Sequence, residues 1–94
     1  MSNQDILLNI AVNLGRLGRW AHAKKTMRIP QFLKDTQVYV DMINGTKINK
    51  NFLPTFIGFS SMFEKLKSRT DYDEEWAEEA FTWANILTHR AKLA

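Results

Sequence analysis

The sequence predicts an all-α protein, a small antiparallel four-helix bundle of the up-down type, with residues 1–94 forming a single helical domain. Apolar residues recur at steps of three and four through most of the chain, which is the spacing of helices that bury one face. Proline and Asn-Gly signals divide the chain into four such segments. The connections within the first pair and within the last pair of segments are short, which favours antiparallel neighbours.

The first predicted helix covers Asn3–Lys25 and organises the remainder of the chain. We expect the helix to end near Lys25, because cations there interact favourably with the negative C-terminal end of the helix dipole. Two rows of apolar or small residues lie side by side on it, and an apolar arc this wide is typical of a helix with more than one packing partner. The first row is Leu7, Ile10, Leu14, Leu17 and Ala21, and the second is Leu8, Ala11, Gly15, Gly18 and His22.

Gly15 and Gly18 stand in the middle of this helix, where each lowers helix propensity by up to ~1 kcal/mol relative to alanine. We interpret Ala11, Gly15 and Gly18 as a flat strip where another helix crosses at close range, either from the same chain or from a second copy. The alternative is a helix that bends or breaks near Gly15.

The narrow polar face of the same helix consists of Asn9, Asn13, Arg16, Trp20 and Lys24. Its tryptophan stands between two cations. Tryptophan and arginine are enriched in binding hot spots. We therefore predict a contact surface that consists of Arg16, Arg19, Trp20, Lys24, Gly15 and Gly18. In the alternative interpretation, Trp20 lies flat at the edge of the core with its N–H in water.

The second helix is predicted to begin at Pro30 and to end at Asn44-Gly45, because proline suits a first turn and glycine suits a helix end. Its inner face is Phe32, Leu33, Thr36, Tyr39, Val40 and Ile43. A β-hairpin across Asn44-Gly45 is the alternative. It would pair residues 36–43 with 46–52 and mix lysine and asparagine into the apolar face, so we favour the helix.

A connection of about nine residues, Gly45–Leu53, precedes the third helix and exceeds the usual length in bundles. We expect Ile48, Phe52 and Leu53 to fix it to the core. The third helix is predicted over Pro54–Arg69. Its inner face carries Phe52, Phe56, Phe59, Met62, Phe63 and Leu66.

The fourth helix is predicted to start with a capping box, Asp71-Tyr72-Asp73-Glu74, and to run to about Lys92. Its inner face is Tyr72, Trp76, Ala80, Trp83, Leu87 and Ala91, with Ala77, Phe81 and Ala84 at the edge. Its outer face is Glu74, Glu75, Glu78, Glu79, Asn85, His89 and Lys92.

The residues offer no catalytic chemistry that we can identify, so we predict no catalytic, cofactor-binding or metal-binding residues and do not expect an enzyme. His22 and His89 are the only histidines, and neither belongs to an H-E-x-x-H or Glu-x-x-His pattern. The chain has no cysteine, no basic-then-apolar leader and no apolar run long enough to span a membrane. We therefore expect a cytoplasmic protein without membrane contact.

The formal net charge of +3 is unevenly distributed. Residues 1–28 contain five basic residues and one acidic residue, a net of +4, whereas residues 72–94 contain five acidic and two basic residues, a net of −3. In an up-down bundle the basic part of the first helix lies beside the acidic part of the last, so we expect the charges to pair largely within the fold. The sequence thus favours a protein-binding module, with a homodimer as one form. A basic nucleic-acid-binding accessory protein is the alternative.

Overall fold

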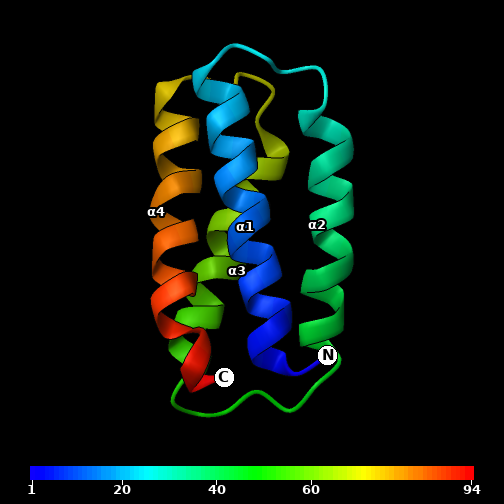
Figure 1. The fold of residues 1–94 in the computed structure, drawn as a ribbon, viewed down its shortest axis with the longest axis vertical. Coiled ribbons are helices and arrows are strands. Elements are labelled where there is room, and N and C mark those ends of the chain that lie inside the picture. The colour runs from blue at the N-terminus through cyan, green and yellow to red at the C-terminus, as the bar shows by residue number, and fades with distance from the viewer.

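Four helices run up and down in a bundle, as Figure 1 shows. The computed structural model describes all residues from 1 to 94 and contains no strand. The helices are α1 (Asn3–His22), α2 (Ile29–Asn44), α3 (Leu53–Ser68) and α4 (Glu74–Arg90), and a short 3₁₀ turn, η1 (Ala91–Leu93), follows α4. The predicted all-α class is confirmed, and the hairpin at Asn44-Gly45 does not form.

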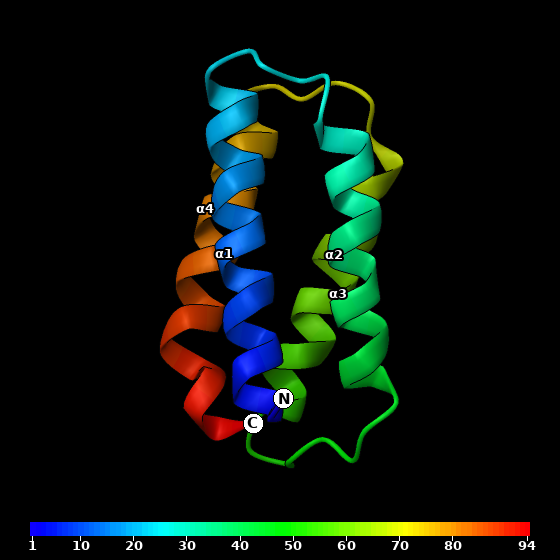
Figure 2. The ribbon, with the colours of Figure 1, turned by 45° about the vertical axis from the view of Figure 1, so that its right-hand side comes forward.

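Each helix is antiparallel to the next one in the chain, and α4 returns to lie beside α1 (Figures 1 and 2). The two short connections lie at one end of the bundle, and the long connection lies at the other end with both termini. Contacts between helices fix this order. They are Asn13–Thr36 for α1 and α2, Gln37–Lys67 for α2 and α3, Leu66–Trp76 for α3 and α4, and His22–Glu74 for α1 and α4.

The core is one cluster of 22 buried apolar residues to which all four helices contribute. The predicted stripe of α1, from Leu7 to Ala21, is at most 1% exposed at every position. The predicted phenylalanine-rich face of α3 is also buried throughout. On α4, Trp76, Ala80 and Leu87 are buried as expected, and Trp83 is half-buried. The spacing of apolar residues therefore identified the inner faces of these helices correctly.

The predicted burial was wrong for two residues, Asn13 and Leu53. Asn13 was placed on the polar face of α1, but it is buried and donates a hydrogen bond to the Thr36 hydroxyl at 3.2 Å. Val12 occupies the outer face instead and is 53% exposed. In the long connection Phe52 is buried and Ile48 packs on the core, whereas Leu53 is 41% exposed and does not fix the segment.

Helix α1 ends at His22, three residues before the predicted end at Lys25. Lys24 has a φ of 62°, in the left-handed region. Its N–H bonds to the Ala21 carbonyl at 3.1 Å, and the N–H of Lys25 bonds to the Trp20 carbonyl at 2.8 Å. This pair of bonds is a Schellman motif, which usually has glycine in the left-handed position. Sequence reasoning missed it because a lysine occupies that position.

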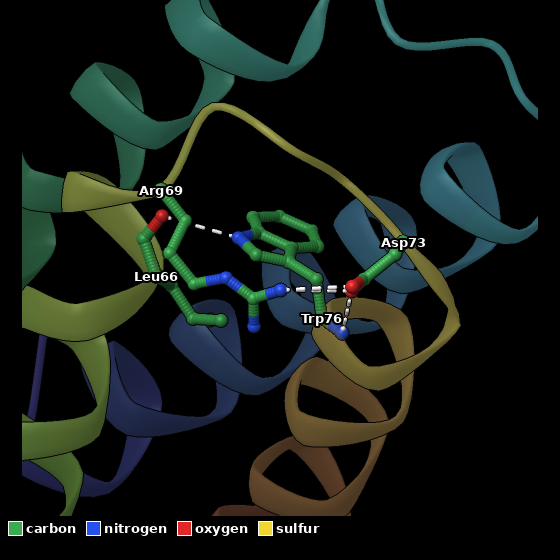
Figure 3. A network of polar contacts seen from close by, with 4 residues as sticks. All are labelled: Leu66, Arg69, Asp73 and Trp76. Carbon is green, nitrogen blue, oxygen red and sulfur yellow. Dashed lines mark hydrogen bonds and ion pairs between the residues drawn. The ribbon is translucent and has the colours of Figure 1, made fainter.

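The N-terminal cap of α4 is Asp73, not the predicted Asp71 (Figure 3). The Asp73 carboxylate accepts a hydrogen bond from the Trp76 N–H at 2.9 Å. Arg69 donates to both oxygens of the same carboxylate at 3.0 Å. The Trp76 N–H and then the Arg69 charge hold the pKa of Asp73 below its ordinary value. The cap therefore joins the end of α3 to the start of α4.

The lowered pKa of Asp73 predicts a pH-dependent contribution to stability. An asparagine in its place would keep the cap but lose the charge, since asparagine and aspartate cap helices equally well. We expect Asp73→Asn to be less stable than the wild type at neutral pH. This difference should vanish as the pH falls through the lowered pKa, because protonation removes the charge from the wild type as well. Urea melts of both proteins from pH 7 to pH 2 measure it, and a constant difference would contradict it.

Candidate contact surface

Five cations gather at the end of the bundle that holds the short connections. We call this set the basic surface, and its residues are Arg16, Arg19, Lys24, Lys25 and Arg28. Two lie on the C-terminal half of α1, and the other three lie in the connection between α1 and α2. All five side chains are exposed. The predicted residues Arg16, Arg19 and Lys24 are therefore all exposed, and the structure adds Lys25 and Arg28, which line one depression with Lys24.

The charges of the basic surface are not neutralised within the fold. None of its five cations lies within 4.0 Å of a carboxylate, and the only contact between an imidazole or cation of α1 and a carboxylate of α4 joins His22 to Glu74 at 3.1 Å. Glu75 instead lines a groove of about 460 Å³ between α3 and α4. The expected pairing of the two helices is thus mostly absent, because part of the acidic face of α4 turns toward α3.

Trp20 is half-buried at the core edge, as in the alternative interpretation of the sequence. Its ring packs at a steep angle against the ring of Phe32, with centroids 5.0 Å apart. The Arg28 guanidinium lies over the Trp20 ring at 5.2 Å, and the Arg16 guanidinium lies 6.0 Å from the Phe32 centroid. Such cation–π contacts contribute about 0.5–1 kcal/mol at exposed sites. The aromatic pair therefore positions two of the five cations.

The two glycines of α1 have different surroundings. A Cβ at Gly18 would lie 2.7 Å from the Phe81 ring, so α4 crosses α1 at close range there. A Cβ at Gly15 would meet only the Arg19 side chain, at 3.4 Å. The close crossing is confirmed at Gly18 and belongs to this chain, whereas Gly15 takes no part in it. Gly18 is buried and lies outside the exposed surface.

A second close contact between glycine and an aromatic ring was missed in the sequence. A Cβ at Gly58 of α3 would lie 3.0 Å from the Trp83 ring. Phe81 and Trp83 are two residues apart on α4, so they point toward different neighbours. Helix α4 thus approaches α1 through Gly18 and α3 through Gly58. A glycine inside the phenylalanine-rich segment could have indicated this contact. The strong apolar periodicity of the segment drew attention to its phenylalanines instead.

The connection between α1 and α2 adds an apolar side chain to the basic surface. Met27 is 96% exposed, the largest exposure among the large apolar residues. Met27 and Trp20 line a shallow depression of about 600 Å³ together with Lys24, Lys25 and Arg28. The depression therefore places a flexible, exposed apolar side chain beside three cations, and methionine adapts readily to different partners.

No helix in this structure combines the length and apolarity needed to cross a membrane. No group of three or more His, Cys, Asp or Glu side chains is close enough to hold a metal ion.

No protein-family model, curated protein or solved structure matches the chain.

Proposed function

We propose that this protein is a small helical interaction module that binds a protein partner through the basic surface, without catalysis. The partner presents carboxylates around an apolar side chain, which contacts Met27. The observation that carries the proposal is a set of five cations, none paired with a carboxylate, three of which share a depression with an apolar residue that is almost fully exposed. A cytoplasmic location is part of the same proposal and accords with a chain that lacks cysteine.

The backbone at Lys24 supports this proposal. A residue other than glycine in the left-handed region costs roughly 1 kcal/mol or more, and such strain tends to occur at functional sites. Glycine at this position would end α1 without strain. The lysine keeps a cation at the point where the chain leaves α1, next to Lys25 and close to Met27 in sequence. If binding requires a positive charge at this position, that requirement explains why a strained lysine stands there and not a glycine.

The five unpaired cations also favour a second candidate function, the binding of nucleic acid. Two features favour a protein partner instead. Trp20 is half-buried, with Phe32 against it and Arg28 over its ring, so a base that stacks on it would have to displace the Arg28 side chain or use what remains of the ring. The acidic residues of α4 begin at the same end of the bundle, where they repel a long polyanion.

A second copy of this chain is one protein partner with suitable chemistry. The outer face of α4 presents Glu78 and, beside its contact with His22, Glu74; both are exposed and complement the basic surface of another molecule. The basic surface and these acids lie at the same end of neighbouring helices, so a two-fold axis can bring each set against the other. Sedimentation at low and moderate salt tests this case, since a charge-mediated dimer dissociates as salt rises.

Binding of a labelled synthetic peptide rich in glutamate with one central leucine tests the proposed surface. We expect Lys24→Gln with Lys25→Gln to weaken binding about tenfold, because exposed charge pairs contribute up to ~1 kcal/mol each. Fluorescence anisotropy measures the affinity. Lys47→Gln with Lys50→Gln is the matched control, since these exposed lysines lie in the long connection at the opposite end of the bundle. Equal losses in both double variants would reject the surface.

Replacing Lys24 by glycine gives this experiment a second readout. The variant removes the left-handed strain, so its free energy of unfolding should rise by up to about 1 kcal/mol while its affinity for the peptide falls. Opposite signs for stability and binding would show that the lysine serves the surface rather than the fold. A variant that loses stability, or that binds as well as the wild type, would contradict the proposal.

A further inference from the structure

A groove between the start of α2 and the end of α3 lies outside the basic surface. Its volume is about 530 Å³, within the range of small-molecule sites. Leu33 and Pro30 of α2 and Tyr72 line it together with the side chains of Lys34, Lys67 and Arg69. Long cationic side chains bury their methylene stems and keep their charged heads at the rim. The groove therefore combines an apolar lining with cations.

The three cations of this groove differ in their partners. Lys67 forms an ion pair with Glu64 at 2.7 Å and donates to Gln37. Arg69 is held by Asp73 at 3.0 Å. Lys34 has no carboxylate within 4.0 Å. Two of the three cations are each paired with a carboxylate. The third, Lys34, is unpaired and therefore carries the one positive charge that is not balanced.

Tyr72 provides the aromatic side of the groove. It is half-buried, and its ring meets that of Trp76 with centroids 5.1 Å apart. Trp76 is fully buried and donates to the Leu66 carbonyl. The position of the Tyr72 ring is thus fixed by a rigid core residue. A preformed apolar wall of this kind reduces the entropy lost when a ligand binds.

We propose that this groove binds a small monoanionic amphiphile, an aliphatic or aromatic body that carries one carboxylate. The apolar body contacts Leu33, Pro30 and Tyr72, and the carboxylate pairs with Lys34. A single unpaired cation complements a monoanion rather than a multiply charged phosphate. This site is independent of the proposed protein-binding function, because none of its lining residues belongs to the basic surface.

Calorimetric titration with octanoate tests the site, with octanol and acetate as matched probes. Octanoate should bind at one site per chain. Octanol lacks the charge and acetate lacks the apolar body, so each should bind at least about tenfold more weakly, the loss expected for one charge-assisted contact or a buried alkyl chain. Amide shifts in an NMR titration should centre on Leu33, Lys34, Thr70 and Tyr72. Equal affinity for octanoate and octanol would overturn the proposal, as would shifts at another part of the molecule.

Lys34→Met supplies the decisive variant, because methionine keeps an apolar stem and removes the charge. Lys34 is exposed and has no ion pair, so the variant should fold as the wild type does. Its affinity for octanoate should fall about tenfold, to that for octanol. Lys50→Met, in the long connection, should bind octanoate normally. Lys24→Gln with Lys25→Gln should also bind it normally, which separates this site from the basic surface. Equal losses in Lys34→Met and Lys50→Met would indicate a general charge effect and reject the site.

Discussion

Gly18→Leu is expected to lower the free energy of unfolding by about 2–3 kcal/mol, because it overpacks the crossing of α1 and α4. Even the first side-chain carbon would lie 2.7 Å from the Phe81 ring, which real Cβ atoms essentially never do. The crossing lies within one chain, so the loss should be the same at every protein concentration. Urea unfolding at two concentrations measures it. A loss that appears only together with dissociation of a dimer would contradict the intrachain contact.

Gly15 provides the matched control on the same helix. Its Cβ would meet only the end of the Arg19 side chain, so Gly15→Ala should stabilise the protein by up to ~1 kcal/mol through helix propensity.

Phe81→Ala should relieve much of the stability loss caused by Gly18→Leu, because it removes the ring that the new side chain meets. Additive effects of these two changes would mean that residues 18 and 81 do not meet.

Trp76→Phe is expected to lower the free energy of unfolding by about 2–3 kcal/mol. Trp76 is fully buried, and its indole N–H donates to the Leu66 carbonyl at 3.1 Å (Figure 3). That carbonyl belongs to the last turn of α3, where no helical N–H is in reach. Removing the indole leaves the carbonyl without its donor, at about 1–3 kcal/mol, and a smaller ring adds a cavity. Thermal and urea unfolding measure the loss.

Trp83→Phe is the matched substitution for this prediction. Trp83 lies two turns further along α4, is half-buried and packs beside Phe59 and Gly58. Its indole N–H makes no hydrogen bond to the chain, so the variant should lose clearly less stability than Trp76→Phe. If both variants lost the same free energy of unfolding, the hydrogen bond to the Leu66 carbonyl would not be the cause of the loss in Trp76→Phe.

The helices could be predicted because their apolar periodicity is strong. The stripe of α1 and the phenylalanine face of α3 point inward as predicted. Helix ends were harder, since they depend on local hydrogen bonds that several residues can make. Asp71 and Asp73 both suit an N-cap, and only the structure shows that Arg69 and the Trp76 N–H converge on Asp73.

The candidate surface was only partly predictable. The run of cations in α1 is visible in the sequence, but whether α4 neutralises it depends on how α4 is rotated about its axis. Glu74 meets His22, whereas Glu75 faces a groove that also holds Lys65 and Arg69. The left-handed Lys24 was not predictable either, because its conformation depends on two backbone hydrogen bonds at the end of α1.

The central claim is that the basic surface binds an acidic protein segment rather than nucleic acid, and one competition measurement tests it most directly. The labelled glutamate-rich peptide is bound to the protein at moderate salt and then titrated with single-stranded and double-stranded oligonucleotides of matched charge. We expect the peptide to remain bound, because Phe32 and Arg28 already pack on Trp20 and the acids of α4 repel a long polyanion. Displacement at sub-micromolar oligonucleotide, steeply salt-dependent and lost in Lys24→Gln with Lys25→Gln, would contradict the claim and indicate a nucleic-acid-binding protein.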